Sequence, residues 1–520
     1  MGGKKLADHI TDLRPELEPG IVTVALEGQQ LRAGSQTPEE VAFEASVRPR
    51  NWFLASLSHS DRGGLVQVRI FGPTMRIQLV ALATLFCVGC GGNSVTAPTA
   101  TVPVPDPGPD LRALIADAGV TPVAPPAAPD PAKVELGRLL MFDKILSGNM
   151  DISCATCHHP FVESGDGLSL SFGTGGTGLG PARQLGAGRP LVARNATPLF
   201  NLASVPVMFW DGRVHGTEGV DLVSPAKEQL PAGFDSTLAV QAMFPVTGHD
   251  EMRGFKGDLR VDGLANEICD LADSDFTGIW AALTARLQAN PEYVARFQAV
   301  FPGQPVSYQN AANAIAAFEI AGFTRLNSPF DHYLAGDDSA LTEAQKRGAL
   351  LFFGDAKCSQ FHNGPLLSDF QFHDVAVPQV GLGKGVEGPL DFGRGRDSGV
   401  QEDRFKFRTS PLRNVAVTGP WTHAGGFTTL EAVVRHYTDP ARSLQEYDVS
   451  QLAPDLQSRV HIQDSIAAGE LDNLDPILQE TFTLTDDQVA DIVAFLEALT
   501  DATPLQDPPD SVPSGLPVGD

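Results

Sequence analysis

The segment CATCH, residues 154–158, constrains this chain more than any other stretch. Two thiols separated by two residues and followed at once by a histidine suit covalent attachment of a c-type haem, because both thiols can add to the haem vinyl groups while the imidazole binds iron. Half of a zinc site or a redox Cys-x-x-Cys pair is the alternative, but the histidine that follows the second thiol at once is typical of haem attachment. We therefore predict haem attachment at Cys154 and Cys157, with His158 as the iron ligand.

A second segment, GDAKCSQFHNGP at 354–365, has the same motif with one part changed. Cys358 and His362 stand in the expected places, but Phe361 occupies the position of the second cysteine. One thioether and one histidine–iron bond suffice to hold haem inside a folded pocket. We predict a second haem c here, attached through Cys358 and ligated by His362. A cytochrome domain without haem is the alternative.

The two motifs end a weak internal repeat. VELGRLLMFDKILSGNMDISCATCH and AQKRGALLFFGDAKCSQFH each begin with a helical apolar pattern that contains a glycine. The alanine-rich stretch 310–326 predicts a further helix, and LTDDQVADIVAFLEALTD predicts a last one capped by Thr485. We therefore expect a mainly α fold with long loops, in which residues 131–335 and 336–500 form two cytochrome c-like helical domains, each built round a c-type haem.

The segment MRIQLVALATLFCVGCGG, starting at Met75, is typical of an export signal. We interpret residues 75–90 as a lipoprotein-type signal peptide with Cys90 as the lipidated residue; an ordinary secretory signal is the alternative. Residues 1–74 have no clear hydrophobic period, so we interpret them as a non-native, disordered upstream extension. Export and c-type haem both predict a periplasmic protein that meets the membrane only through a lipid anchor.

Two segments are rich in proline. Residues 91–130 favour an extended, solvated backbone and predict a tether, interrupted by a short helix around 111–118. Residues 501–520 are rich in Pro and Asp and predict a disordered tail.

Charge and cysteine content exclude several classes of protein. A formal net charge of −26 opposes binding to nucleic acid and to anionic lipid, and would attract a small basic electron carrier. The six cysteines are too few and too scattered for a disulfide framework in 520 residues. Cys269 has no assigned role; we expect a buried free thiol, and a disulfide to Cys358 is the alternative.

Ordered blocks along residues 131–500 resemble the bacterial di-haem cytochrome c peroxidase family, including its MauG-like subgroup. The blocks are SCATCHHP, RNATPLFNL, FWDGR, DEM, LTEAQKRGALLF, SPLRNVAVTGPWTHAGGF and TLEAVVRHY. The resemblance implies that the haem at His158 is the peroxidatic one and that the haem at His362 receives electrons. It also implies hydrogen peroxide as substrate, a small cytochrome c or cupredoxin as donor, and pairing into a homodimer.

The resemblance assigns further residues. Trp210 in FWDGR matches the tryptophan that lies between the haems, with a buried core tryptophan as the alternative. Asn195, Thr418 and Pro420 match positions that hold calcium, and amide and carbonyl oxygens suit that ion. Glu251 matches a glutamate of the distal pocket. A carboxylate can move a proton between the peroxide oxygens as the bond between them breaks. The alternative for Glu251 is a solvated surface residue.

Two positions depart from the common family pattern. Thr174 stands where many members have a distal histidine, so an open iron position is expected unless His215 or His249 substitutes. Tyr437 stands where the axial methionine of the second haem is usual, as in the MauG-like subgroup, and a phenolate there would stabilise ferric iron. His436 is the rival ligand, and a core aromatic is the other interpretation of Tyr437.

We therefore predict a periplasmic di-haem cytochrome c peroxidase with Glu251 and Trp210 as its catalytic residues. One alternative is a MauG-like oxidase that acts on a protein or a small molecule. Another is an electron-transfer cytochrome without catalysis. A third is a relic with a single haem, whose second domain binds a partner.

Overall fold

The computed structural model describes residues 108–217 and 220–518, together with the backbone of four strands nearer the N-terminus. These strands are β1 (Ile21–Val24), β2 (Glu39–Ser46), β3 (Val66–Arg69) and β4 (Arg76–Ala83). They form an antiparallel sheet in the order β1-β3-β4-β2, within a unit that is separate from residues 104–520. β4 falls inside the predicted signal peptide, and Cys90 lies outside the described residues. The upstream extension, the signal and the anchor therefore stay predictions.

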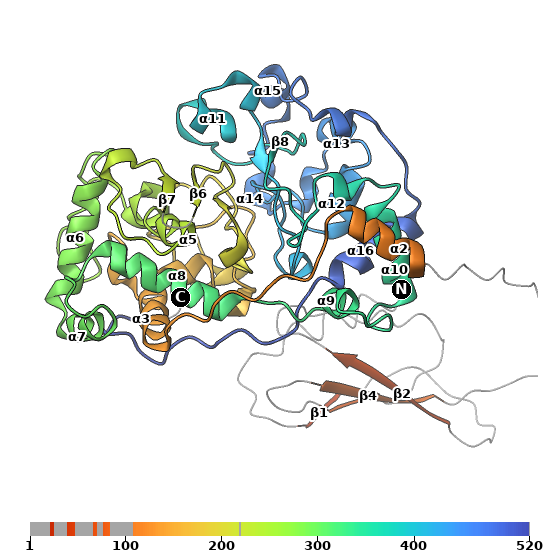
Figure 1. Cartoon of the computed structure of the whole chain (residues 1–520), viewed down its shortest axis with the longest axis horizontal. Helices are drawn as coiled ribbons and strands as arrows, with labels where there is room; N and C mark the ends of the chain where they lie inside the picture. Colours follow the sequence, from red (N-terminus) through yellow and green to blue (C-terminus); the bar gives the residue numbers. More distant parts are fainter. Residues whose placement is uncertain are drawn as a thin grey trace, which may run out of the picture. The chain divides into compact units, whose positions relative to one another are not determined.

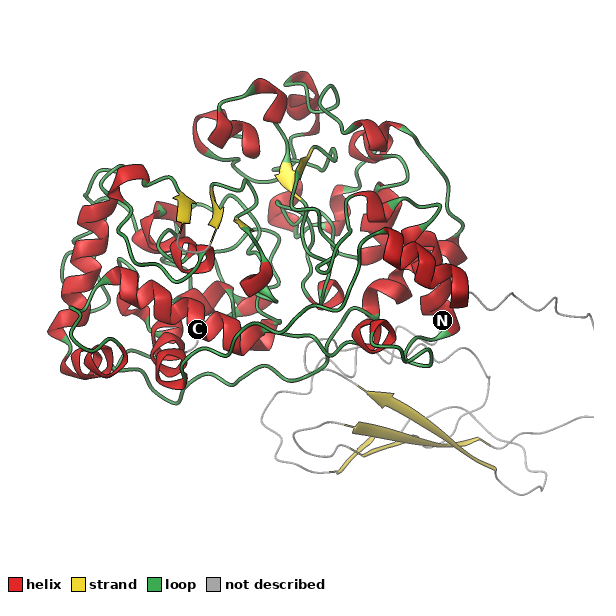
Figure 2. Ribbon diagram, viewed as in Figure 1, coloured by secondary structure: helices red, strands yellow, loops and turns green. Residues whose placement is uncertain are grey.

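The second unit is rich in helices, as Figures 1 and 2 show. Its first helices are α2 (Gly108–Asp117), α3 (Pro131–Phe142), α4 (Cys154–Cys157), α5 (Thr237–Gln241), α6 (Phe276–Ala289), α7 (Pro291–Val300), α8 (Tyr308–Phe323) and α9 (Pro329–Leu334). The later ones are α10 (Glu343–Phe353), α11 (Arg394–Ser398), α12 (Leu430–His436), α13 (Pro440–Gln445), α14 (Pro454–Gln457), α15 (Ile462–Ala467) and α16 (Asp486–Glu497).

Strands are short in this unit. β5 (Val207–Met208), β6 (Val214–Thr217) and β7 (Val220–Val223) form one sheet, and β8 (Phe372–His373) pairs with β9 (Phe407–Arg408). Long loops make up most of the remainder, as the sequence predicts. Within the described part of the chain, none of the helices has the length and apolarity needed to cross a membrane.

The first hydrophobic core forms where α3 packs on α8. Asp130 caps α3 by accepting hydrogen bonds from the first backbone amides, and Ser307 caps α8 in the same way. The buried side chains of α3 include Leu136, Leu140 and Phe142. The helix predicted over 310–326 is confirmed as α8.

The second core forms where α10 packs on α16. Thr485 caps α16 in a capping box with Gln488, which confirms the predicted cap. Phe330 of α9 also belongs to this core, because its ring stacks on Phe353 and meets Phe495 edge-on. The second core therefore begins before the predicted domain boundary at 335/336.

A glycine in each repeat explains how these helix pairs come so close. A Cβ atom on Gly137 of α3 would lie 1.8 Å from the carbonyl oxygen of Ala314 on α8. A Cβ atom on Gly348 of α10 would lie 1.8 Å from the carbonyl oxygen of Asp491 on α16. Each glycine therefore allows backbone contact with the crossing helix, which gives the glycines of the internal repeat one shared structural role.

Both ends of the described range 108–518 pack on the two hydrophobic cores. Leu111 and Ile115 of α2 are buried in the second core, so residues from 108 onward belong to the folded unit and the predicted tether is shorter than 91–130. The predicted disorder of the C-terminal tail is wrong for residues 501–518. Val512 is buried in the first core, and Ser514 donates a hydrogen bond of 2.7 Å to Asp143.

Backbone carbonyls also hold the tail. Arg325 donates hydrogen bonds to the carbonyl oxygens of Thr503 and Pro504, over 3.2 and 2.9 Å. Asn290 donates to the carbonyl of Pro513 over 2.8 Å. Such bonds need no apolar side chains in the tail, which is why its composition resembles that of a disordered segment.

Candidate active site

The CATCH motif lies in the wall of a cavity beside the first hydrophobic core, which we call the first cavity. Cys154, Cys157 and His158 line it, and Ser153 caps the short helix α4 that carries the thiols. The Nδ1 atom of His158 lies 3.2 Å from the carbonyl oxygen of Ser164. A carbonyl oxygen only accepts, so Nδ1 carries the proton and Nε2 keeps a lone pair for a metal. Burial raises the pKa of Cys154 to about 12, which keeps the thiol protonated.

The CSQFH motif, residues 358–362, lies in the wall of a second cavity. Cys358, Phe361 and His362 line it. The Nδ1 atom of His362 donates to the carbonyl oxygen of Leu367 over 3.0 Å, as His158 does to Ser164. Burial lowers the pKa of His362 to about 4, so its ring is neutral at physiological pH. The histidines of the two repeats are therefore oriented in the same way.

Phe361 is packed where the missing thiol would stand. Its ring is 6% exposed and meets the ring of His373 edge-on, with 4.4 Å between centroids. His373 is itself held between Asp475 and Asp369, at 2.7 and 3.0 Å. The phenyl ring therefore makes a structured apolar contact in place of a second sulfur.

Tyr437, and not His436, faces the second cavity. Tyr437 lines the cavity, and burial raises the pKa of its hydroxyl to about 12. His436 points elsewhere, with Nδ1 at 2.9 Å from the Ser443 hydroxyl and Nε2 at 2.8 Å from the carbonyl oxygen of Val375. Both nitrogens of the rival ligand are thus occupied.

Trp210 lines both cavities. It lies in the turn between β5 and β6, and its indole nitrogen donates to the backbone carbonyl of Asn195 over 3.0 Å. Trp210 is thus one of the residues, with Asn195 and Arg408, that separate the two cavities. This placement fits the predicted role between two haems.

The predicted calcium donors share one cavity wall. Asn195, Thr418 and Pro420 all line the second cavity, and Asn195 also lines the first. The side-chain nitrogen of Asn195 donates to the carbonyl of Leu168 over 2.9 Å, which leaves its oxygen available to a cation. Among the described residues, no group of three or more His, Cys, Asp or Glu side chains is placed to hold a metal ion. A cation here would rest on amide and carbonyl oxygens.

Glu251 lines the first cavity from a single π-helical turn, His249–Arg253. Burial, followed by the charge of Asp250, raises the pKa of Glu251 to about 6, while Lys384, Arg213 and Arg194 oppose that rise. A carboxyl group with this pKa exchanges protons readily near neutral pH. Glu251 is half-buried in the cavity wall, which favours the distal-pocket interpretation over that of a solvated surface residue.

Neither of the two predicted substitutes for the distal ligand, His215 and His249, lines the first cavity, and Thr174 is absent from its wall as well. The hydroxyl of Thr174 donates to Asp151 over 2.9 Å. His215 is bonded through Nδ1 to the carbonyl of Gly212, at 2.9 Å. His249 is held between the carbonyl of Gly254 and the carboxylate of Asp273.

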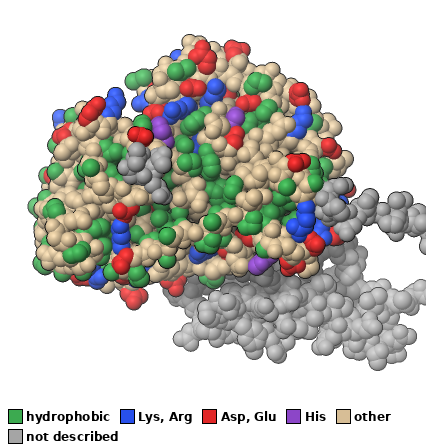
Figure 3. Space-filling model, viewed as in Figure 1, with side chains coloured by type: hydrophobic (Ala, Val, Ile, Leu, Met, Phe, Trp, Pro, Cys, Tyr) green, Lys and Arg blue, Asp and Glu red, His purple; other side chains and the backbone are tan. Residues whose placement is uncertain are grey.

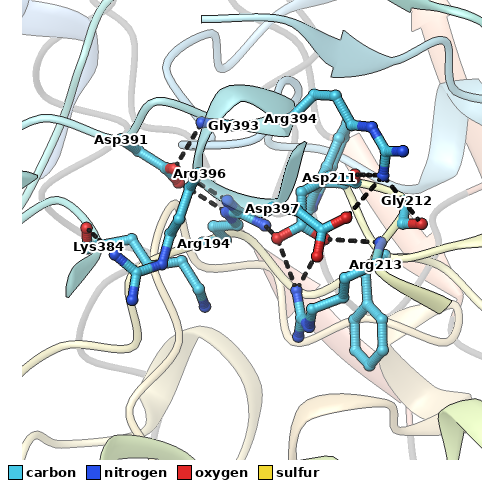
Figure 4. Close-up of polar contacts among 12 residues, drawn as sticks. Arg194, Asp211, Gly212, Arg213, Lys384, Asp391, Gly393, Arg394, Arg396 and Asp397 are labelled. Atoms are coloured by element: carbon cyan, nitrogen blue, oxygen red, sulfur yellow. Dashed lines mark hydrogen bonds and ion pairs between the residues drawn. The ribbon is translucent and has the colours of Figure 1, made fainter. Parts of the chain in front are cut away.

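Buried ion pairs join the loop after β8 to the segment that contains Trp210 (Figure 4). Arg194 makes bonds of 2.6 and 2.8 Å to Asp391 and one of 2.6 Å to Asp211. Arg213 also pairs with Asp211, at 3.0 Å. Each carboxylate is at most 2% exposed, so these pairs are shielded from solvent salt.

Sequence reasoning missed Glu319. This residue of α8 lines the first cavity, and one of its carboxyl oxygens has no hydrogen bond. Burial raises the pKa of Glu319 to about 8, so the group is neutral at pH 7. The signal was present, since an acidic residue between Phe318 and Ile320 interrupts an otherwise apolar helix.

Arg408 was also missed, and it shows that the cavities fit haem. It lines both of them and donates to the backbone carbonyls of Phe209 and Thr409. No described carboxylate pairs with it, and burial lowers its pKa to about 10. A buried guanidinium without an anion is costly. Haem carries two propionates, so the thiols, the oriented imidazoles and this cation together match the cofactor that the motifs predict.

Cys269 matches the expected buried free thiol. It is 3% exposed and donates to the carbonyl oxygen of Asn266 over 3.1 Å. Cys358 is also a free thiol, so the two do not form a disulfide.

Comparisons with known proteins agree with this geometry. A profile of the di-haem cytochrome c peroxidase family matches residues 131–339. The chain is 30% identical over 370 residues to the methylamine utilization protein MauG of Methylorubrum extorquens, covering 69% of this chain and 84% of that protein. It is 34% identical over 305 residues to the cytochrome c551 peroxidase of Pseudomonas aeruginosa, covering 58% of this chain and 70% of that one.

A solved structure is also similar, that of a MauG-like protein associated with microbial copper homeostasis. The TM-score is 0.51 at 26% identity, covering 75% of this chain and 95% of that one. The shared length, the profile and the similar architecture lead to one conclusion: the chain belongs to the di-haem cytochrome c peroxidase family and is a peroxidase-type oxidoreductase that uses haem.

Proposed function

We propose that this protein reduces hydrogen peroxide with electrons that a small carrier delivers to the second cavity. The observation that carries the proposal is Trp210, which lines both cavities while each holds one motif. In the balanced reaction, one peroxide takes up two electrons and two protons and gives two waters.

The chain would hold one haem through the thioethers of Cys154 and Cys157 and the imidazole of His158. It would hold the other through a single thioether at Cys358, with His362 and Tyr437 as iron ligands. The orientation of both imidazoles by backbone carbonyls supports these roles. Haem, when bound, supplies the iron that binds peroxide and stores the electrons.

Glu251 handles the proton in the first cavity. As the bond between the peroxide oxygens breaks, its carboxylate accepts the proton from one oxygen and returns it to the other, which leaves as water. Its place in the cavity wall and its raised pKa of about 6 support this role. Trp210 lies on the path by which electrons reach that cavity.

The distal position is proposed to be open to peroxide without prior rearrangement. Thr174, His215 and His249 are each hydrogen-bonded to neighbours and absent from the cavity wall, which supports an open position. Calcium is proposed at Asn195, Thr418 and Pro420, beside the bond from Trp210 to Asn195. There the ion would hold the segments that meet between the two cavities.

Tyr437 favours a second candidate function. It lines the second cavity, and the resemblance to the MauG-like subgroup implies a tyrosine at this place in an enzyme that oxidises a protein or a small molecule. The same cavities would serve both functions. The two functions differ in the source of the electrons that reduce the oxidised site. In the peroxidase they come from the small carrier, and in the MauG-like enzyme they come from a bound protein or small molecule.

The proposed location is the periplasm, with a lipid anchor at Cys90 and association into a homodimer. The donor is proposed to be a small cytochrome c or a cupredoxin. The net charge of −26 would speed the encounter with a basic carrier, and that effect should weaken with added salt.

The test starts from protein matured in a periplasm. Intact mass and the pyridine haemochrome spectrum would give two haems, one with the red-shifted band of a single thioether. Peroxide turnover should be present in the wild type and collapse in Glu251→Gln. No turnover in the wild type would favour an electron carrier. A count of one haem would overturn the roles of Cys358, His362 and Tyr437.

A further inference from the structure

A glycine-rich loop, residues 381–388, presents one lysine to the first cavity. Gly383 and Gly385 flank Lys384 with φ angles of +64° and +70°. A Cβ atom on Gly383 would lie 2.2 Å from the carbonyl oxygen of Leu390, and one on Gly385 would lie 1.6 Å from the Arg396 guanidinium. The positive φ angles favour glycine at both positions, and the backbone contact at Gly383 excludes a Cβ atom there, so the glycines set the course of the backbone on either side of Lys384.

Buried and partly buried ion pairs hold this loop. The amide of Lys384 donates to the carbonyl of Leu390 over 3.0 Å, and Arg396 pairs with Glu387 at 2.5 Å. Asp391, which follows the loop closely, forms a buried ion pair with Arg194. Figure 4 shows Lys384, Arg396 and Asp391 beside this network, and Figure 3 shows basic side chains gathered near α11. The loop therefore has a fixed place over the cavity.

The side chain of Lys384 enters the cavity that contains Glu251. Arg194 and Arg213 line the same wall, but both are paired with Asp211. The ammonium group of Lys384 has no hydrogen bond or ion pair with any described residue. Arg408 also lines this cavity without a carboxylate partner, but it donates to the backbone carbonyls of Phe209 and Thr409, so among these four cations Lys384 alone has no bonded partner among the described residues.

We propose that Lys384 is a positioning residue for proton transfer, whose ammonium group keeps Glu251 ionised across the cavity so that it can accept the peroxide proton. This inference rests on the proposed function, because it concerns the group that handles the proton there. Lys384 lies in the loop 381–388, whereas Glu251 lies in the π-helical turn His249–Arg253. These two segments would therefore have to be packed together for Glu251 to be kept ionised.

The electrostatics agree with this role. The charged groups that act on Glu251 are Asp250, Lys384, Arg213 and Arg194, and Lys384 has the largest lowering effect on its pKa. Burial, and then Arg194 and Arg213, lower the pKa of Lys384 to about 8, so most of its ammonium groups stay charged at pH 7.

The test follows cyanide binding to the ferric holo-protein through the Soret band, from pH 4.5 to 8. Hydrogen cyanide must lose its proton in the cavity, as peroxide must, so rapid association needs the carboxylate form of Glu251. The rate should fall below a midpoint near pH 6 in the wild type. Glu251→Gln should remove this pH dependence.

The proposal concerns the midpoint in Lys384→Met. Loss of the cation should raise the midpoint by about one pH unit. At pH 5 this makes association about tenfold slower than in the wild type. Lys384→Arg should stay near the wild-type midpoint, and Lys256→Met, which removes an exposed lysine, should not move it. Lys384→Gln is measured in parallel as a polar replacement.

Three outcomes would count against the proposal in different ways. An unchanged midpoint in both Lys384→Met and Lys384→Gln would overturn it while leaving the peroxidase function intact. A changed reduction potential with an unchanged midpoint would show that Lys384 instead pairs with a haem propionate. A wild type that binds no cyanide at any pH would overturn the open distal position, and this inference with it.

Discussion

The indole nitrogen of Trp210 donates a 3.0 Å hydrogen bond to the backbone carbonyl of Asn195, and the side chains of both residues line both cavities. The proposed electron path and the proposed calcium site therefore share one bond. The orientation of the indole ring depends on the segment that would bind the cation.

Trp210→Phe should separate the structural from the electronic role of this residue. The phenyl ring keeps most of the packing but loses the donor, which should cost about 1 kcal/mol in the free energy of unfolding. Rapid mixing with peroxide should also show slower electron transfer from the second haem to the first. Trp421→Phe is the matched control, because Trp421 donates a 3.0 Å bond to Val415 but lines only the second cavity. Equal slowing in both variants would remove Trp210 from the electron path.

Gly137→Ala and Gly348→Ala should each destabilise one helix pair. The added methyl group would overlap a backbone carbonyl that cannot move aside without shifting the helix, at a cost of about 1–3 kcal/mol. Chemical denaturation would measure the loss. Gly322→Ala in α8 is the control, since its Cβ would come no closer than 3.3 Å to any atom and meets only the Phe318 ring. Wild-type stability in the first two variants would show that the close helix approach is not required.

The sequence predicted those features that depend on local pattern. The helices at 308–323 and 486–497, the Thr485 cap and the two haem motifs follow from spacings within short windows. Trp210 and Glu251 were reached through the family resemblance, and the structure puts both in the cavity walls. Lys384 and Arg408 were not predicted, because an isolated lysine in an irregular loop and an arginine in the two-residue strand β9 give no local signal, and only tertiary packing brings them to the first cavity.

The tail was mispredicted for a different reason. Composition reports how much apolar surface a segment can bury, and residues 501–518 have little of it. They are held instead by side chains of Arg325 and Asn290 that bind their carbonyl oxygens. Arg325 and Asn290 lie far from the tail in the sequence, so no local sequence pattern predicts these contacts.

Ser514→Ala should show that this tail contributes to stability. Ser514 donates to Asp143, which is fully buried and also accepts a 2.7 Å bond from the hydroxyl of Tyr293. Loss of one bond to a buried carboxylate should cost about 2 kcal/mol in the free energy of unfolding. Ser511→Ala, at an exposed position of the same tail, should change it little. If the two variants unfold alike, the tail is not docked in solution.

Glu470→Gln should change how stability depends on pH. Glu470 is 1% exposed with one unpartnered oxygen, and burial raises its pKa to about 7. The folded state then keeps a proton that the unfolded state releases above the ordinary pKa of about 4.3. Stability should therefore fall as the pH rises from about 4.3 toward 7, by up to about 1.4 kcal/mol per unit.

Urea unfolding of the wild type at pH 5 and pH 7 should show this fall, and Glu470→Gln should flatten it. Buried Asp374, whose pKa is also raised by burial and by Glu470, contributes with the same sign, so part of the slope should remain. Glu402→Gln, at an exposed position, should keep the full slope. A slope in Glu470→Gln as steep as that of the wild type would place the proton elsewhere.

Phe361→Cys should restore the complete attachment motif in the second cavity. Phe361 lines that cavity next to His362, so a thiol at this position would face the same space as Cys358. The pyridine haemochrome band should move from the position typical of one thioether to that of two.

The ring contact with His373 is lost at the same time, and removing a buried phenyl group costs about 3 kcal/mol. The yield of holo-protein should therefore rise only if the stability gained from the second thioether exceeds the stability lost with the phenyl ring. Phe352→Leu, which shortens a different buried ring on the same cavity, should lower stability without moving the band. An unmoved band in Phe361→Cys would mean that residue 361 does not reach the haem vinyl group, and it would overturn the prediction that this position completes the attachment motif.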